Sequence, residues 1–189
     1  MTRAASDRIA NPPGDELPGE LMIWVLIVSE LLVFGAGLAA FLAVRVTDPE
    51  GFAAAQSHLH RAAAGVNTLI LVTSGWLAAL ATRAAAKGRV LQARWLLSGA
   101  ALLGIVFLAV KATEFADLSA KGITTDTHAF FTFSYLLTGF HAAHVAAGIV
   151  LLTYVTFRPR PDTTETVAAF WHMVDLVWMM LLPVIYLVS

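Results

Sequence analysis

The sequence contains no cysteine, which excludes disulfides, thiolate metal sites and thiol nucleophiles. Charge is also scarce, because Asp, Glu, Lys and Arg make up 13% of the 189 residues and the formal net charge is -1. A chain with so little positive charge lacks the field that nucleic-acid binding requires. We therefore expect no nucleic acid among its partners.

The first twenty residues contain no apolar run. This stretch, MTRAASDRIANPPGDELPGE, carries four acidic residues and three prolines, which is unlike a signal or transit peptide. The pattern predicts an exposed polar tail at 1–20, followed by a single domain at 21–189.

What the sequence has in excess is apolar residues, at 58% of the chain and a mean hydropathy of +0.74. Crossing a bilayer core of about 30 Å takes roughly 20 helical residues. Five stretches are long enough, and the loops between them are too short for a soluble catalytic domain. The sequence predicts an all-α integral membrane bundle with transmembrane helices near 21–44, 65–83, 94–116, 128–157 and 167–188.

Lysine and arginine are distributed unevenly between the two ends of this bundle. The amino tail and the second and fourth loops, with their flanks, hold eight of them, whereas the opposite side holds four. By the positive-inside rule, we expect a cytoplasmic amino terminus and an outside carboxyl terminus.

Several polar residues fall inside the predicted spans. A charge at the bilayer centre costs at least about 2.5 kcal/mol, so such side chains face the bundle and find partners. Helical depth places several of them at comparable levels, which predicts a polar layer joining the first, fourth and fifth spans. The residues expected in a buried polar network are Ser29, Glu30, Lys111, Glu114, His141, His144, His172 and Asp175.

Each of these residues has alternative interpretations. The histidines fit neutral hydrogen-bonding contacts between helices, or ligands of a metal or heme. Lys111 and Glu114, three residues apart, fit an intrahelical pair near the outer face. The residues three and four away from Glu30 are all apolar, so its partner must come from elsewhere. Glu30 either fixes helix register or exchanges protons.

Five tryptophans divide by position. Trp24, Trp95 and Trp171 lie near span ends and are typical of interfacial anchors. Trp76 and Trp178 lie deeper, where we expect them to fill packing space.

Five segments in order resemble subunit III of the heme-copper oxidases. They are WVLIVSELLVFGAGLAAFLAV, NTLILVTSG, VKATEF, TGFHAAHVAAG and WHMVDLVWMMLLPVIYL. The resemblance covers about residues 20–188, and the short chain matches members with five spans, which lack the two leading helices of the longer form. Within the family, LPGELMIWVLIVSEL is most similar to small variants associated with nitric oxide reductase systems.

This resemblance implies a noncatalytic subunit of a bacterial inner-membrane respiratory complex, with no cofactor and no metal of its own. It would pack against the catalytic subunit of a heme-copper oxidase or nitric oxide reductase, among membrane lipids, and support proton uptake, assembly or stability. Glu30 matches the family's buried acid, and Lys111 and Glu114 match its lysine-glutamate pair. The two histidines of the fourth span, and His172 with Asp175, match its polar bundle positions.

Two other classes of function stay open from the residues alone. One is a stand-alone membrane protein that handles protons or ions through Glu30. The other is a small membrane enzyme with a histidine-carboxylate metal site. The few histidines inside spans and the lack of any Glu-x-x-His pair disfavour the enzyme.

Overall fold

A computed structural model describes residues 21–187, and the tail expected at 1–20 lies outside this range. The described chain is helical, with no strand between residues 21 and 187. Five helices are long and apolar enough to cross a membrane, which confirms the predicted all-α fold. The elements are α2 (Leu21–Thr47), α3 (Pro49–Gln56), α4 (Arg61–Ala86), α5 (Val90–Ala120), α6 (Ala129–Phe157), α7 (Pro161–Leu182) and the π-helix η1 (Pro183–Leu187).

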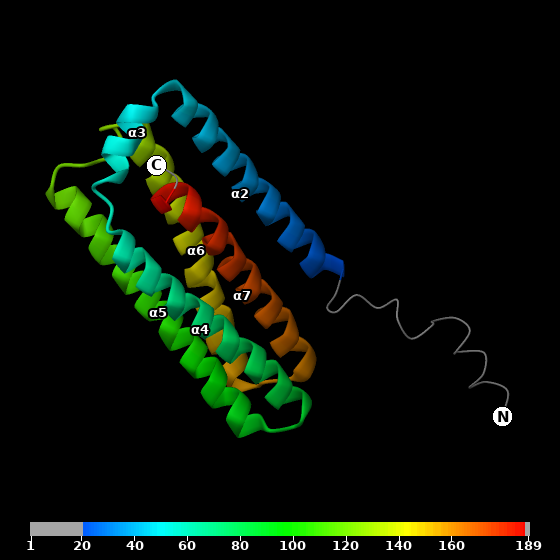
Figure 1. The fold of residues 1–189 in the computed structure, drawn as a ribbon. Coiled ribbons are helices and arrows are strands. Elements are labelled where there is room, and N and C mark those ends of the chain that lie inside the picture. Colours follow the sequence, from blue (N-terminus) through cyan, green and yellow to red (C-terminus); the bar gives the residue numbers. More distant parts are fainter. Residues whose placement is uncertain (1–20, 188–189) are drawn as a thin grey trace, which may run out of the picture.

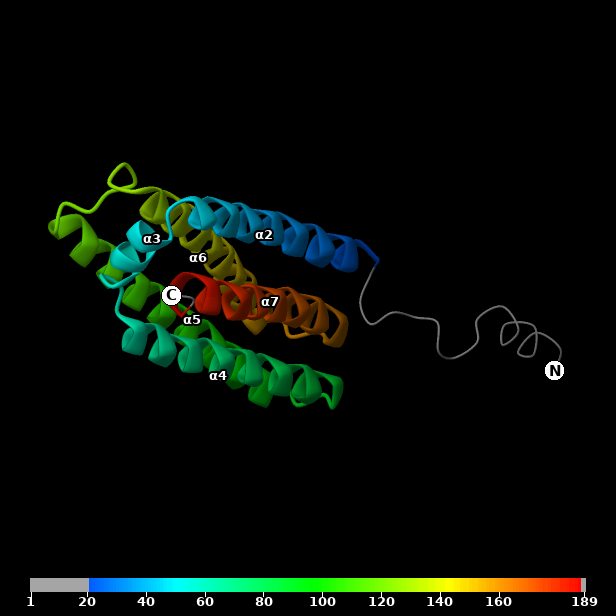
Figure 2. The same ribbon diagram turned by 45° about the horizontal axis from the view of Figure 1, so that its top comes forward.

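Four long helices form the body of the bundle, and α2 lies along its side (Figure 1). Helix α4 packs mainly on α5 and α7, and α5 packs on α6. Helix α2 packs less extensively, on α6 and α7, with Phe34, Leu38 and Phe41 as its buried residues. Figure 2 shows the same arrangement from a second direction. Most of the α2 surface therefore faces outward.

The helices extend beyond their apolar runs, and two of the connections between them begin with a tight turn. Both Lys-Gly pairs of the predicted loops end a helix in a Schellman motif. Gly88 and Gly122 have φ values of 69° and 73°, which a residue with a Cβ adopts only with strain. The following amides, of Arg89 and Ile123, donate back to the carbonyls of Ala84 and Leu118 at 2.9 and 3.0 Å.

Helix α3 is an element that the sequence interpretation missed, because RVTDPEG was expected to be a loop. Asp48 accepts a hydrogen bond from the Gly51 amide and caps this helix, and Pro49 occupies its first turn. Asp48 also lies 3.0 Å from Nε2 of His128, whose Nδ1 accepts a hydrogen bond from the Phe130 amide at the start of α6. One contact therefore joins the caps of two helices.

Trp171 is buried at the centre of the bundle, contrary to the interfacial role expected for it. Its indole nitrogen donates to Ser74 Oγ at 3.1 Å, and that hydroxyl donates to the Ala100 carbonyl at 2.7 Å. Its ring lies against Gly104 of α5 and Gly148 of α6. Helix α7 begins six residues earlier than predicted, so Trp171 lies ten residues inside it rather than near its start.

Of the other tryptophans, Trp178 and Trp95 lie as expected, whereas Trp76 does not. Trp178 is buried, as expected, but Trp76 is 62% exposed and does not fill interior space. Trp95 is exposed near the start of α5, as an interfacial anchor would be.

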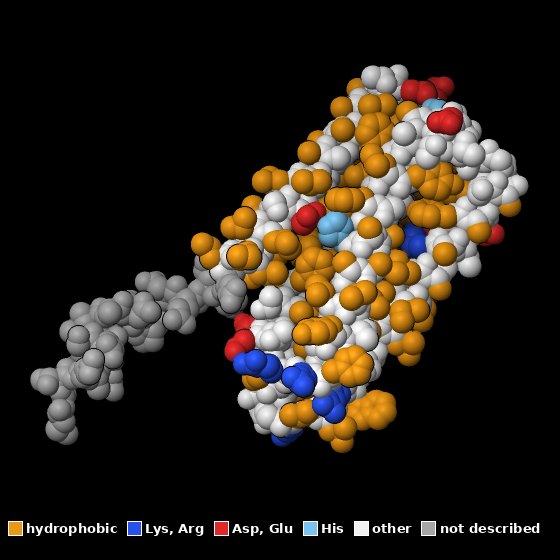
Figure 3. All heavy atoms as spheres, turned by 180° about the vertical axis from the view of Figure 1, so that it is seen from behind, with side chains coloured by type: hydrophobic (Ala, Val, Ile, Leu, Met, Phe, Trp, Pro, Cys, Tyr) orange, Lys and Arg blue, Asp and Glu red, His pale blue; other side chains and the backbone are white. Residues whose placement is uncertain are grey.

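Basic side chains gather at one end of the bundle (Figure 3). This is the end at which α4 meets α5, and the start of α2 and the α6–α7 connection lie toward it (Figure 1). Helix α3, the α5–α6 connection and η1 lie at the other end. The expected orientation of these ends across the membrane stays a prediction.

Candidate functional site

The polar residues singled out from the sequence fall into separate places rather than one layer. Lys111, Glu114 and His141 are buried, and Glu30, His144 and Asp175 are partly buried. Ser29 and His172 differ from the expectation because both are exposed. Ser29 lies about 100° around α2 from Glu30, so it points in a different direction. Its hydroxyl donates to the Leu26 carbonyl of its own helix.

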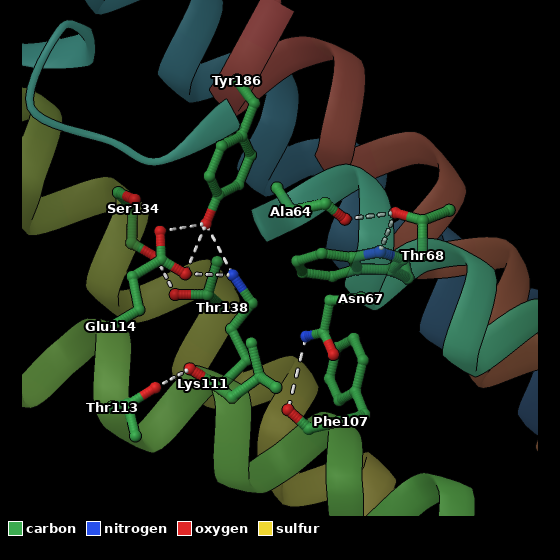
Figure 4. Close-up of polar contacts among 12 residues, drawn as sticks. Ala64, Asn67, Thr68, Phe107, Lys111, Thr113, Glu114, Ser134, Thr138 and Tyr186 are labelled. Carbon is green, nitrogen blue, oxygen red and sulfur yellow. Dashed lines mark hydrogen bonds and ion pairs between the residues drawn. The ribbon is translucent and has the colours of Figure 1, made fainter. Parts of the chain in front are cut away.

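The most extensively bonded group is a buried triad of Lys111, Glu114 and Tyr186, shown in Figure 4. The Lys111 amine donates to Glu114 Oε2 and to Tyr186 Oη, both at 2.6 Å. The Tyr186 hydroxyl donates to Glu114 Oε1 at 2.9 Å. The intrahelical Lys111–Glu114 pair was predicted, whereas the contribution of Tyr186 from η1 was not.

A π-helix brings Tyr186 to this triad. Pro183 has no amide hydrogen to continue the helical pattern of α7, and the chain continues as η1. The Ile185 carbonyl accepts a hydrogen bond from buried Gln56 of α3 at 2.9 Å. Helix α3 therefore holds the segment that carries Tyr186.

The second polar site is the contact between α2 and α6. Glu30 Oε2 lies 3.2 Å from His144 Nε2, and both side chains are mostly covered. The rings of Phe34, Phe140 and Phe170 lie 5.7, 4.7 and 6.5 Å from the His144 ring. The partner that Glu30 required from another helix is therefore a histidine in an aromatic environment. Figure 3 shows an acidic and a histidine side chain together amid apolar surface.

The His144 tautomer limits what this contact can hold. Its Nδ1 lies 2.9 Å from the Phe140 carbonyl, and because a carbonyl only accepts, Nδ1 carries a hydrogen. Nε2 and the Glu30 oxygen then attract one another when one proton lies between them, on either atom. With no proton between them, the lone pair of Nε2 would face a carboxylate oxygen. With two protons between them, an N–H donor would face an O–H donor, and both arrangements are repulsive. Nε2 is thus the ring nitrogen that faces the Glu30 carboxyl.

The contact leaves hydrogen-bonding capacity on Glu30. Its Oε2 lies within ion-pair distance of His144 but makes no aligned hydrogen bond with any residue in 21–187. An apolar pocket of about 240 Å³ adjoins this site, lined by Val33, Phe34, Gly37, Leu136, Leu137 and Phe140.

His141 lies one turn from His144 but in a different environment. Its ring stacks on Trp178 at 5.3 Å and meets the edges of Phe34 and Phe107. Neither ring nitrogen has a hydrogen-bond partner among the described residues. An interhelical hydrogen bond, the contact expected for this residue, is therefore not formed between described residues.

His172 and Asp175 form the third polar site, on α7. His172 Nδ1 lies 3.8 Å from Asp175 Oδ2, and the Asp175 carboxyl packs directly against the backbone of Gly75 in α4. A side chain at position 75 would overlap this carboxyl. The pair therefore contacts the second span. The single-layer hypothesis had placed it with the first and fourth spans instead.

The described residues offer no group of three or more His, Asp or Glu side chains positioned to bind one metal ion. Three buried polar residues outside the expected network also bond between helices: Gln56, Ser74 and Asn67. The Asn67 amide donates to the Phe107 carbonyl at 3.3 Å. Asn67 and Ser74 were visible as polar residues inside an apolar run, and only packing shows their partners.

The fold and these sites define a small multi-pass helical membrane protein in which several ionisable groups are paired inside the bundle. The family model for cytochrome c oxidase subunit III matches residues 20–189. The chain therefore belongs to the cytochrome c oxidase subunit III family, which confirms the resemblance to subunit III, whereas the association with nitric oxide reductase stays a prediction. It is a multi-pass protein of a bacterial inner membrane.

Individual relatives agree with this family. Cytochrome c oxidase subunit 3 of Corynebacterium diphtheriae is 33% identical over 176 residues, which cover 87% of this chain and 86% of the relative. Cytochrome c oxidase subunit 3 of Thermostichus vulcanus is 31% identical over 201 residues, covering 100% and 94%. Heme-copper oxidase subunit I+III of Aeropyrum pernix is 29% identical over 211 residues, covering 95% of this chain and 25% of the relative.

Proposed function

We propose that this chain is a noncatalytic subunit of a respiratory heme-copper oxidase complex, packed against the catalytic subunit. Membership of the subunit III family supports this role. The Aeropyrum pernix relative supports the choice of partner, because its name joins subunits I and III in one polypeptide. Subunit I is accordingly the partner that we assign to this chain.

Within the complex, Glu30 and His144 support proton uptake by the catalytic subunit. The observation that carries this proposal is the 3.2 Å contact between Glu30 Oε2 and His144 Nε2. Helix α2 packs on one side only, and the Glu30 side chain is 23% exposed. Water or a group of the partner subunit can therefore exchange a proton with the pair.

His172 and Asp175 serve assembly rather than proton transfer. The Asp175 carboxyl lies against Gly75 of α4, so its role is to hold α7 on α4. His172 has a side chain that is 47% exposed, which leaves it accessible to lipid or to the partner. Replacing His172 with alanine should lower the amount of assembled complex more than its turnover.

Copurification tests the proposed partnership. The chain, tagged at its carboxyl terminus, is extracted from its native membrane in gentle detergent, and the eluate is examined for heme absorbance and for reduction of oxygen and of nitric oxide. We expect a heme-containing partner that reduces oxygen. A complex that reduces only nitric oxide would support the nitric oxide reductase association instead, and a chain eluting alone without heme would contradict the proposal.

A further inference from the structure

A second feature lies inside the bundle, where two fully buried polar side chains border Phe107. Asn67 of α4 is 0% exposed and His141 of α6 is 1% exposed. The Asn67 amide donates to the Phe107 carbonyl, and the His141 ring lies 5.7 Å from the Phe107 ring. Within residues 21–187, Asn67 Oδ1 and both ring nitrogens of His141 have no hydrogen-bond partner. No function described above uses these atoms.

Trp178 of α7 also borders both side chains. The His141 ring stacks on the Trp178 ring at 5.3 Å, and the Trp178 indole donates at 2.9 Å to Thr68, the residue that follows Asn67. Figure 4 shows Asn67 beside Phe107, with Thr68 on the same helix. Helices α4 and α6 each pack on α5 and α7. Asn67 and His141 therefore approach the same part of the core from opposite corners of the bundle.

Both side chains lack a hydrogen-bond donor. A carbonyl only accepts, so Asn67 contacts Phe107 through its amide nitrogen, and the atom left over is the acceptor Oδ1. No carboxylate of residues 21–187 lies within ion-pair distance of His141. A charged imidazole buried in this way is costly, so His141 is neutral and has one bare nitrogen, which is also an acceptor.

The surrounding aromatic rings do not supply the missing donor. A ring face can accept an N–H group, but Phe34 and Phe107 have no N–H or O–H to give. The indole N–H of Trp178 is already donated to Thr68. Leaving a buried acceptor unpaired costs more than an ordinary hydrogen bond contributes. One imidazole and one amide are too few ligands for a metal ion. A water molecule, however, has two O–H groups and satisfies two acceptors at once.

We propose that an internal water molecule binds between Asn67 and His141. It donates one hydrogen to Asn67 Oδ1 and the other to the bare nitrogen of His141. The interhelical contact expected of His141 is then formed through water, and it joins α4 to α6 across the diagonal of the bundle. The site lies wholly within this chain, so it does not depend on the proposed partnership.

Density for ordered solvent tests this site without any substitution. The structure of the full-length wild-type chain is determined by crystallography or electron cryomicroscopy at a resolution that shows bound water. We expect a solvent peak within hydrogen-bonding distance, about 2.7 to 3.2 Å, of both Asn67 Oδ1 and one ring nitrogen of His141. A peak that reaches only one of the two residues, or no peak, would overturn the proposal.

A double-mutant cycle tests whether the two residues depend on one another. N67L and H141F each remove a polar group with little change in volume and leave the water with one partner fewer. Each should raise the unfolding equilibrium constant about 10-fold. In N67L/H141F the constant should be about 5-fold smaller than the product of the two single effects, because the second substitution removes a group that has already lost its partner. The bond from Asn67 to Phe107 is lost in N67L and in the double variant alike, so its contribution cancels.

The matched control combines H141F with S74A. Ser74 is another buried polar residue of α4, but its hydroxyl is already bonded to Ala100 and Trp171. Its effect should therefore multiply with that of H141F without coupling. Coupling as small in N67L/H141F as in S74A/H141F would overturn the proposal. The density measurement needs no variant, so it decides the question if a substitution prevents folding.

Discussion

Lys111 is tolerated 3% exposed inside a membrane bundle because every group around its amine is complementary. It donates to Glu114 and Tyr186, and its amine also lies 4.6 Å from the Trp178 ring centroid and 4.8 Å from that of Tyr186. Such rings attract a cation through their electron-rich faces. The three polar groups therefore act as a unit, and removing Lys111 leaves the charge of Glu114 buried with only the Tyr186 hydroxyl as its partner.

Replacing Lys111 alone should lower the stability of the fold more than replacing all three residues of the triad. K111M leaves the Glu114 carboxylate buried without a counter-charge, which costs about 3 to 5 kcal/mol. A K111M/E114L/Y186F triple variant removes all three polar groups and should recover most of that loss. Thermal unfolding in detergent compares them, and a triple variant less stable than K111M would contradict this explanation.

At the residue scale, the sequence predicts which polar side chains lie within the membrane spans, but not which residues each of them contacts. The spacing of Lys111 and Glu114 was sufficient to predict their pairing, because i,i+3 neighbours share a helix face. The partner of Glu30 was expected on another helix, on another subunit or in water, and only the packing of α2 on α6 identifies His144 as a partner. His141 and His144 share a helix face, yet one contacts aromatic rings alone and the other a carboxyl.

At the element scale, close approach of the helices depends on glycine at a few defined positions. The Trp171 ring fits between α5 and α6 because Gly104 and Gly148 have no side chains. A Cβ at Gly104 would lie 2.8 Å from the ring, and one at Gly148 would overlap it. Gly148, which ends the small-residue stretch AAHVAAG, therefore contacts one specific tryptophan.

Gly148→Ala should destabilise the bundle by about 1 to 3 kcal/mol, since an added methyl in a packed core forces its neighbours to shift. Gly139→Ala, in the same helix, is the control, because a Cβ at Gly139 would have no atom within 4 Å. The unfolding midpoint and the yield of folded protein measure both. Equal behaviour of the two variants would contradict the assigned packing of Trp171.

The Asp48–His128 contact predicts that the stability of the α3 cap decreases at low pH. The hydrogen bond from His128, followed by that from the Gly51 amide, lowers the pKa of the exposed Asp48 carboxyl from its ordinary value of 3.8. The unfolded chain therefore takes up this proton first as the pH falls. The stabilisation is complete above about pH 4 and is lost as the pH falls through the lower pKa of the folded state.

Hydrogen exchange of the α3 amides measures this loss. Their protection factors should decrease below about pH 4 in the wild type, and an Asp48→Asn variant should show a flatter profile because position 48 no longer titrates. The amides in the middle of α5 serve as an internal reference. Protection of α3 that falls equally in both chains would show that Asp48 is not the responsible group.

The elements themselves were largely predictable. Apolar length was sufficient to find five spans, and Gly88 and Gly122 marked two helix ends because only glycine adopts their conformation without strain. Charged ends of α5 and α7 were left out of the predicted helices, since hydropathy detects the membrane-embedded part and not the whole helix. Helix α3 is only eight residues long, so Asp48 and Pro49 were the local signals for it.

At the scale of the whole molecule, the two ends of the bundle differ in charge. The predicted orientation has a cytoplasmic amino terminus and an outside carboxyl terminus. Reporter fusions after Lys87 and after Lys121 test it, and we expect the first inside and the second outside. Both reporters on one side would contradict the five-span topology, and an exchanged pattern would reverse the orientation.

The central claim concerns what Glu30 does for the complex. Glu30→Gln keeps the size of the side chain and much of its hydrogen bonding, but it removes the proton that Glu30 and His144 exchange. The variant should therefore still copurify with the catalytic subunit, as the wild type should.

The decisive measurement is the rate of proton uptake by the Glu30→Gln complex in proteoliposomes as a function of pH. The account predicts slower uptake than in the wild type, with the largest difference at alkaline pH, where free protons are fewest and a proton-holding group matters most. Wild-type uptake and wild-type pH dependence in the assembled Glu30→Gln complex would contradict the account and leave Glu30 with a packing role alone.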